Sequence, residues 1–146
     1  LKRYIDENAL DIKLLINHVE FTTTQLSAQD VRHLKGENVW FETVYLSHSD
    51  LARAKKPQHM ARLIRAVPDA QWVMSSDSGQ PSNPSSPDAM LTFARLLNRH
   101  GVSVEKLDEM AKASSVIEEQ DYFPGILNYM HLIFQIKMYL MPALMK

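Results

Sequence analysis

The sequence has 146 residues, of which 45% are hydrophobic and 23% charged, and its formal net charge is -1. A chain of this length can form one domain with a substantial core, and its near-neutral charge gives no electrostatic reason to expect nucleic acid as a partner. Because cysteine is absent, any metal ion must be bound by His and carboxylate side chains. The charged first segment, LKRYIDENALDIK, differs from a secretory signal peptide, so we expect a cytoplasmic protein.

Three short apolar segments predict strands that are buried on both faces. They cover residues 12–16, 39–46 and 70–74, and apolar residues follow one another in each of them instead of alternating with polar ones. Near-continuous apolar runs of this length are typical of strands in parallel sheets covered by helices.

Apolar residues recur at helical spacing between these strands and after the last one. We expect Ser27 to cap the first of these helices, and Pro57 and Pro87 to lie in the first turns of the next two. Gly101 should end the third helix, and Ser103 can cap a fourth. Strands that alternate with helices predict an α/β fold with a parallel sheet joined by crossover connections.

Polar side chains with possible chemistry lie at the ends of the three predicted strands. His18, His48 and Asp77 each stand at or just past a strand end, and the carboxyl ends of parallel strands meet at one edge of the sheet. Two imidazoles and a carboxylate are ligands that a divalent metal ion accepts. The alternatives are that Asp77 only shapes a turn and that the two histidines are hydrogen-bonded residues at the rim.

Glu42 is an unusual residue in its position, because it interrupts the apolar segment VWFETVYL. A carboxylate within a buried strand needs a cation, a metal ion or several hydrogen-bond donors beside it, or it must be neutralised. The alternative is that this strand lies at the edge of the sheet and that Glu42 faces water.

The segment SSDSGQPSNPSSPDAMLTFARLLNRHGVSVEKLDEMA resembles the last strand, loop and helices of amidohydrolase-like metal-dependent hydrolases. It is similar to a branch with the signature Ser-Asp-x-Gly-Gln-x-x-Asn-Pro, which here occupies residues 76–84 and is followed by Gly-Val-Ser at 101–103. Upstream, INHVEF and ENVWFETVYL look like the two preceding strands, with His18 and Glu42 at matching places. The resemblance covers about residues 10–112.

This resemblance implies a partial (β/α)₈ barrel, in which residues 1–120 form the carboxy-terminal part and the three strands are the sixth, seventh and eighth. It implies that His18 and Asp77 bind a divalent metal, with zinc the expected ion, and that Asp77 also transfers protons. His48 matches no family ligand and is expected only to line the pocket. A small-molecule substrate with an amide, ester or lactone bond would then contact Glu42, His48, Ser78, Gln80 and Asn83.

The sequence also departs from the family pattern. The His-x-His pair that the family's first strand supplies occurs nowhere in the chain, and three strands alone leave two open edges. We therefore expect either a hydrolase site that a second chain completes or, as the alternative, a non-catalytic barrel remnant that acts in interaction or oligomerisation.

Residues 121–146 are predicted to form a separate, apolar helix after the Pro-Gly break at 124–125. Asn128, His131 and Gln135 form a narrow polar stripe on an otherwise apolar stretch at 126–145. The stretch is long enough to span a membrane, but its polar interruptions and Pro142 argue against a span. We expect a helix buried in the protein or in a homo-oligomer. A helix lying on a membrane surface is the remaining alternative.

Overall fold

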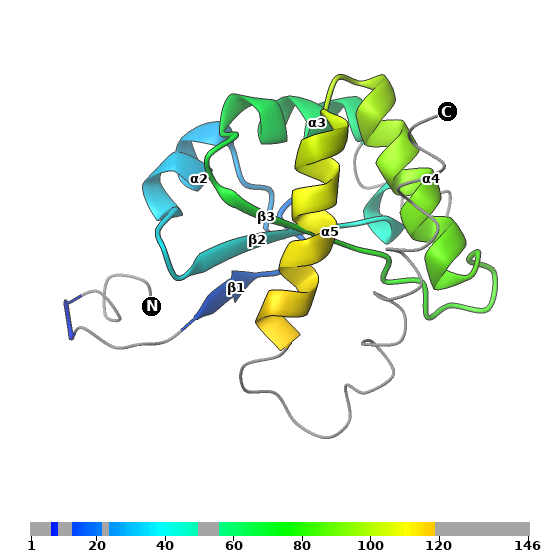
Figure 1. Cartoon of the computed structure of the whole chain (residues 1–146), viewed down its shortest axis with the longest axis horizontal. Coiled ribbons are helices and arrows are strands. Elements are labelled where there is room, and N and C mark those ends of the chain that lie inside the picture. The colour runs from blue at the N-terminus through cyan, green and yellow to red at the C-terminus, as the bar shows by residue number, and fades with distance from the viewer. Residues whose placement is uncertain (1–6, 9–12, 22–23, 50–55, 119–146) are drawn as a thin grey trace.

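The computed structural model describes residues 7–8, 13–21, 24–49 and 56–118, with only the backbone beyond residue 113. In chain order its elements are β1 (Leu14–Ile16), α2 (Ala28–Leu34), β2 (Val39–Val44), the 3-10 turn η1 (Leu46–His48), α3 (Pro57–Ala66), β3 (Gln71–Ser75), α4 (Ser86–Arg99) and α5 (Val104–Glu118) (Figure 1). This order is the predicted alternation of strands and helices.

The three strands form one parallel sheet in the order β1-β2-β3, which confirms the predicted α/β class. Leu14 is paired with Val39 at the start of β1, and Phe41 of β2 is paired with Trp72 of β3. The central strand is therefore β2, and the carboxyl ends of all three strands point to the same edge of the sheet.

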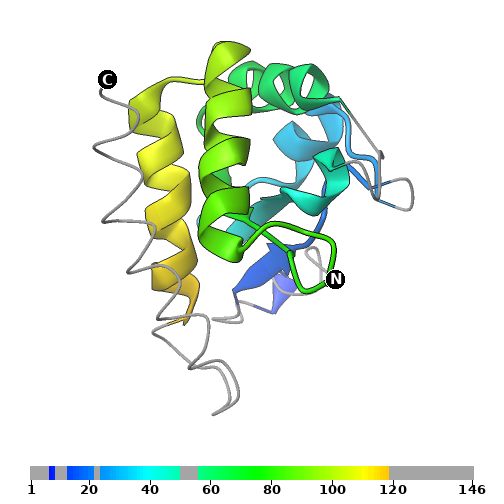
Figure 2. The same cartoon turned by 90° about the vertical axis from the view of Figure 1, so that its right-hand side faces the viewer.

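The hydrophobic core lies between the sheet and its helices. Phe41 and Trp72 face it from neighbouring strands with ring centroids 5.5 Å apart, and the indole Nε1 of Trp72 donates a hydrogen bond of 2.9 Å to the Val67 carbonyl. Figures 1 and 2 show α5 running across the sheet beside α4, and its buried Leu107 and Met110 join the same core. Burying each such apolar side chain contributes about 1.5–3 kcal/mol.

The predicted helix starts and stops are confirmed. The Ser27 hydroxyl accepts a hydrogen bond from the Asp30 amide while the Asp30 carboxylate accepts one from the Ser27 amide, which is a capping box. Pro57 and Pro87 lie in the first turns of α3 and α4. Gly101 follows α4 with a φ of 88°, a conformation that favours glycine.

The first strand differs from its predicted burial and the second from its predicted end. The prediction that all three are buried on both faces is wrong for β1, because Leu15 is 36% exposed in this short edge strand. The second strand ends at Val44, since the chain turns at Leu46 to His48 instead of continuing. Backbone hydrogen bonding to β3 nevertheless continues one residue past Val44, because the Tyr45 amide donates to the Ser75 carbonyl.

The predicted apolar helix at 126–145, and the boundary at residues 120 and 121, lie outside the described residues. Among the helices of the described part, none is long and apolar enough to cross a membrane.

Candidate functional site

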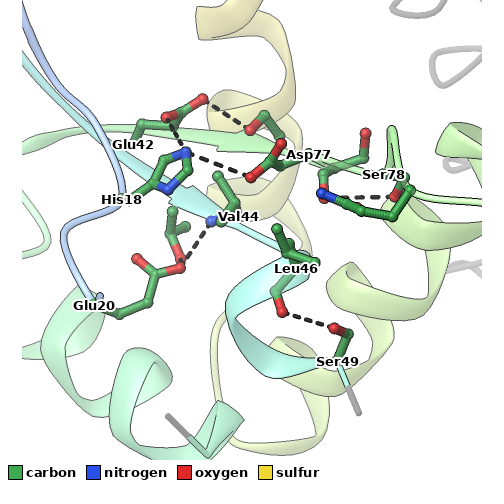
Figure 3. A network of polar contacts seen from close by, with 12 residues as sticks. His18, Glu20, Glu42, Val44, Leu46, Ser49, Asp77 and Ser78 are labelled. Carbon is green, nitrogen blue, oxygen red and sulfur yellow. Dashed lines mark hydrogen bonds and ion pairs between the residues drawn. The ribbon is translucent and has the colours of Figure 1, made fainter. Parts of the chain in front are cut away.

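Three side chains that carry potential chemistry come together at the carboxyl edge of the sheet. The Nε2 atom of His18 lies 3.8 Å from Oε2 of Glu42 and 3.7 Å from Oδ2 of Asp77. Figure 3 shows the imidazole between the two carboxylates. The side chains of His18 and Asp77 are each 35% exposed, so this cluster is partly open to solvent.

The parallel sheet explains why residues so far apart in the sequence meet. His18 follows the end of β1 by two residues, Glu42 lies within β2, and Asp77 follows the end of β3 by two residues. His18 and Asp77 also have left-handed backbones, with φ values of 51° and 46°. Strained conformations of this kind concentrate at functional sites, where the surrounding structure holds them in place.

Glu42 lies in the central strand, and its side chain is only 16% exposed. The alternative that it belongs to an edge strand and faces water is therefore wrong. The hydroxyl of Ser75 donates a hydrogen bond of 2.8 Å to its Oε1 atom, while its other oxygen faces His18. The half-buried carboxylate thus has one hydrogen-bond donor and an imidazole nearby.

A second polar cluster, centred on Glu20, lies beside the first. The Glu20 carboxylate is 2% exposed, and its Oε1 accepts hydrogen bonds from the Val44 amide at 2.9 Å and the Thr43 hydroxyl at 3.1 Å. Nε2 of His48 lies 3.6 Å from the same oxygen. Burial raises the pKa of the Glu20 carboxyl, and the hydrogen bonds from Val44 and Thr43 oppose that shift.

His48 occupies an enclosed position. Its imidazole has no solvent exposure and stacks on the Phe93 ring, with centroids 4.9 Å apart. The role predicted for it, lining a substrate pocket, stays a prediction, and the enclosed position does not favour contact with a substrate. Glu20, which faces His48, was not among the site residues predicted from the sequence. The signal available for it was a carboxylate two residues after His18 in an otherwise apolar setting.

The loop that follows β3 carries the other predicted substrate-binding residues. The Ser78 hydroxyl donates to the Ser76 carbonyl at 3.5 Å. The Asn83 amide donates to the Gln80 carbonyl at 3.0 Å, and their side chains are also hydrogen-bonded to each other. These hydrogen bonds lie within the loop and do not join Ser78, Gln80 or Asn83 to the His18 cluster. Their contact with a substrate stays a prediction.

The donor set of this cluster is chemically suited to a divalent cation. In the described part of the chain, no three His, Asp or Glu side chains form a ready-made metal-binding group. However, two atoms bound to one zinc ion at about 2.1 Å each can lie at most about 4.2 Å apart. The two distances from His18 meet that limit, so its imidazole could share an ion with either carboxylate.

The position of Ser75 argues against a serine nucleophile activated by His18. Nucleophilic serines need an imidazole beside the hydroxyl, and a carboxylate on the far side of that imidazole. Here the Ser75 hydroxyl donates to the Glu42 carboxylate, which lies between the hydroxyl and His18. The cluster can instead bind a cation between the imidazole and the carboxylates.

The comparisons with protein-family models, curated proteins and solved structures give no match for this chain.

Proposed function

We propose that His18 and Asp77 bind a divalent metal ion, with zinc the expected one, and that the chain is a metal-dependent hydrolase of the amidohydrolase type or the carboxy-terminal part of one. The observation that supports this is the approach of one imidazole nitrogen to two carboxylate oxygens, at 3.7 and 3.8 Å, where parallel strands end. Ligands and reacting groups of parallel α/β proteins gather at this edge of the sheet.

Each residue has a distinct role in this proposal. When bound, such an ion polarises a carbonyl group and makes hydroxide available near neutral pH. Asp77 accepts and returns the proton of the attacking water, since its carboxylate is partly exposed and faces the imidazole. Glu42 helps to hold the ion or orients the substrate, and Ser75 fixes its carboxylate. The substrate would be a small molecule with an amide, ester or lactone bond.

The proposed architecture is a partial (β/α)₈ barrel in which β1, β2 and β3 are the sixth, seventh and eighth strands. Three consecutive parallel strands, each followed by a helix, support this proposal. The remaining strands and ligands would then come from a second chain or from another copy of this one.

Zinc titration calorimetry tests the site. We expect wild-type protein to bind zinc, and His18→Ala and Asp77→Ala each to lower its affinity at least about tenfold. His33→Ala is the matched control, because that imidazole is exposed on α2 and should leave the affinity unchanged. Equal zinc affinity in wild type and all three variants would contradict zinc binding by His18 and Asp77.

Turnover tests the chemistry separately. Wild-type protein and Asp77→Asn would be assayed with zinc against chromogenic ester, lactone and anilide substrates. A positioned acid–base group contributes about 10²–10⁴-fold to the rate, so a loss of that size is expected in the variant. Undiminished turnover in Asp77→Asn would contradict the role of this carboxylate.

A non-catalytic interaction protein is the second candidate. It is favoured by the sheet itself, because within the described residues β1 and β3 each pair with β2 alone and leave one edge open. This reading predicts no zinc uptake, together with a mass in solution above that of the 16.7 kDa chain.

A further inference from the structure

A carboxylate continues the hydrogen bonding of β2 beyond the end of β1. The paired residues of β1 reach only as far as Phe41 of β2, whereas β3 pairs with β2 as far as Val44. On the β1 side, the Glu42 carbonyl accepts from the Val19 amide at 3.0 Å, and the Val44 amide donates to the Glu20 carboxylate at 2.9 Å. Glu20 therefore supplies the acceptor that a longer β1 would have provided.

The segment that carries Glu20 contacts both faces of the sheet at the end of β2. Consecutive strand residues point to opposite faces, so Glu42 and Thr43 lie on different sides. The His18 imidazole approaches the Glu42 carboxylate, and the Glu20 carboxylate accepts from the Thr43 hydroxyl. Two residues of one loop thus contact this strand end from opposite sides.

From this arrangement we infer that Glu20 is a positioning residue, whose buried carboxylate anchors the loop after β1 to the end of β2 and so sets the place of His18. The left-handed backbone of His18 needs such an anchor, because that conformation is unfavourable without support. The Leu26 amide completes the attachment, because it donates a hydrogen bond of 2.9 Å to the Val19 carbonyl. The effect on metal binding rests on the proposed function.

Amide hydrogen exchange tests the anchor without any metal. In Glu20→Ala the Val44 amide loses its acceptor, and we expect the Val44 and Val19 amides to exchange at least about tenfold faster. Glu20→Gln keeps an Oε1 acceptor of similar shape, so exchange should stay within about threefold of wild type. The Trp72 indole N–H, which donates to Val67 within the core, reports whether the fold as a whole has loosened.

Zinc affinity tests the positioning role. Loss of groups that orient a metal ligand costs about 10–100-fold in affinity, and we expect a loss of this size in Glu20→Ala but not in Glu20→Gln. Gln71→Ala is the matched control. The Gln71 side chain donates hydrogen bonds to the Gly36 and Glu37 carbonyls at the end of the sheet opposite the His18 cluster. This variant should therefore lose stability without losing zinc affinity.

The outcomes separate the inference from the proposed function. Unchanged exchange at Val19 and Val44 in Glu20→Ala overturns the anchor, and an equal loss of zinc affinity in Gln71→Ala overturns the positioning role. If Glu20→Ala fails to fold, Glu20→Gln and Thr43→Val decide. Wild-type exchange of the Val44 amide in Glu20→Gln, together with faster exchange of that amide in Thr43→Val, supports the anchor. Faster exchange of the Val44 amide in Glu20→Gln, together with wild-type exchange in Thr43→Val, overturns it. If wild-type protein binds no zinc, the proposed function fails while the exchange data still judge the anchor.

Discussion

The Nε2 atom of His18 lies 3.7 Å from Oδ2 of Asp77, and both residues hold left-handed backbones, with φ values of 51° and 46°. The two residues come from different loops, and 58 residues separate them in the sequence. Backbone conformations of this kind cost of order 1–3 kcal/mol each. The structure therefore holds two strained positions at the point where an imidazole and a carboxylate meet.

Backbone strain at Asp77 predicts that glycine at this position gives a more stable protein than alanine does. We expect Asp77→Gly to unfold at higher urea than Asp77→Ala, because relief of about 1–2 kcal/mol of left-handed strain outweighs the entropic cost of about 0.5–1 kcal/mol that glycine brings. Ser82, an exposed residue of the same loop whose φ is not positive, gives the control pair. Ser82→Gly should be no more stable than Ser82→Ala. If the glycine and alanine variants rank in the same order of stability at both positions, strain at Asp77 is contradicted.

Ser75 is expected to tune the candidate metal centre through Glu42. Its hydroxyl donates a hydrogen bond of 2.8 Å to the Glu42 carboxylate, which would be left without this donor in Ser75→Ala. Loss of a hydrogen bond that orients a ligand should lower zinc affinity about tenfold by calorimetry. Ser82→Ala serves as the control and should bind zinc as wild type does. An unchanged affinity in Ser75→Ala would exclude Glu42 from the ion's surroundings.

Trp72 is predicted to dominate the stability of the core. It is fully buried, and its indole donates a hydrogen bond of 2.9 Å to the Val67 carbonyl. Trp72→Phe removes that bond and leaves a cavity, so we expect a loss of about 2–3 kcal/mol in the free energy of unfolding by urea titration. Leu15→Ala, at a position 36% exposed, should cost less than about 1 kcal/mol. Comparable losses at both positions would contradict the described core.

The capping box of α2 predicts a pH-dependent contribution to stability. Hydrogen bonds from Ser27 hold the pKa of the Asp30 carboxyl below its usual value of 3.8. Because the folded-state pKa is lowered, this stabilisation is present above pH 3.8 and is lost as the pH falls through the folded-state value. Urea midpoints should therefore separate wild type from Asp30→Asn at about pH 6 and converge as the pH falls below the folded-state pKa of Asp30. A gap that persists at low pH would contradict this assignment.

Local residue chemistry predicted the helices well. Ser27, Pro57 and Pro87 mark helix starts whose causes lie within one turn of the chain, and Gly101 marks a stop for the same reason. The parallel sheet also followed from sequence, because apolar runs alternate with these helices. Such signals need no knowledge of distant contacts.

The sequence could predict that His18 and Asp77 would meet, because parallel strands end at one edge. It offered a weak signal for Glu20 but could not predict its burial, which depends on β1 ending before β2 and leaving the Val44 amide without a strand partner. Nor could it show that His48 would be enclosed against Phe93, since the turn after β2 directs that side chain. Both features arise from strand lengths and turns that single residues do not specify.

Anomalous X-ray scattering from crystals grown with zinc would test the proposed metal site, because it locates the ion. We expect a peak within about 2.2 Å of both the His18 Nε2 atom and an Asp77 carboxylate oxygen, with a Glu42 oxygen adjacent. A map with no peak at these residues, or zinc bound only elsewhere on the protein, would contradict it.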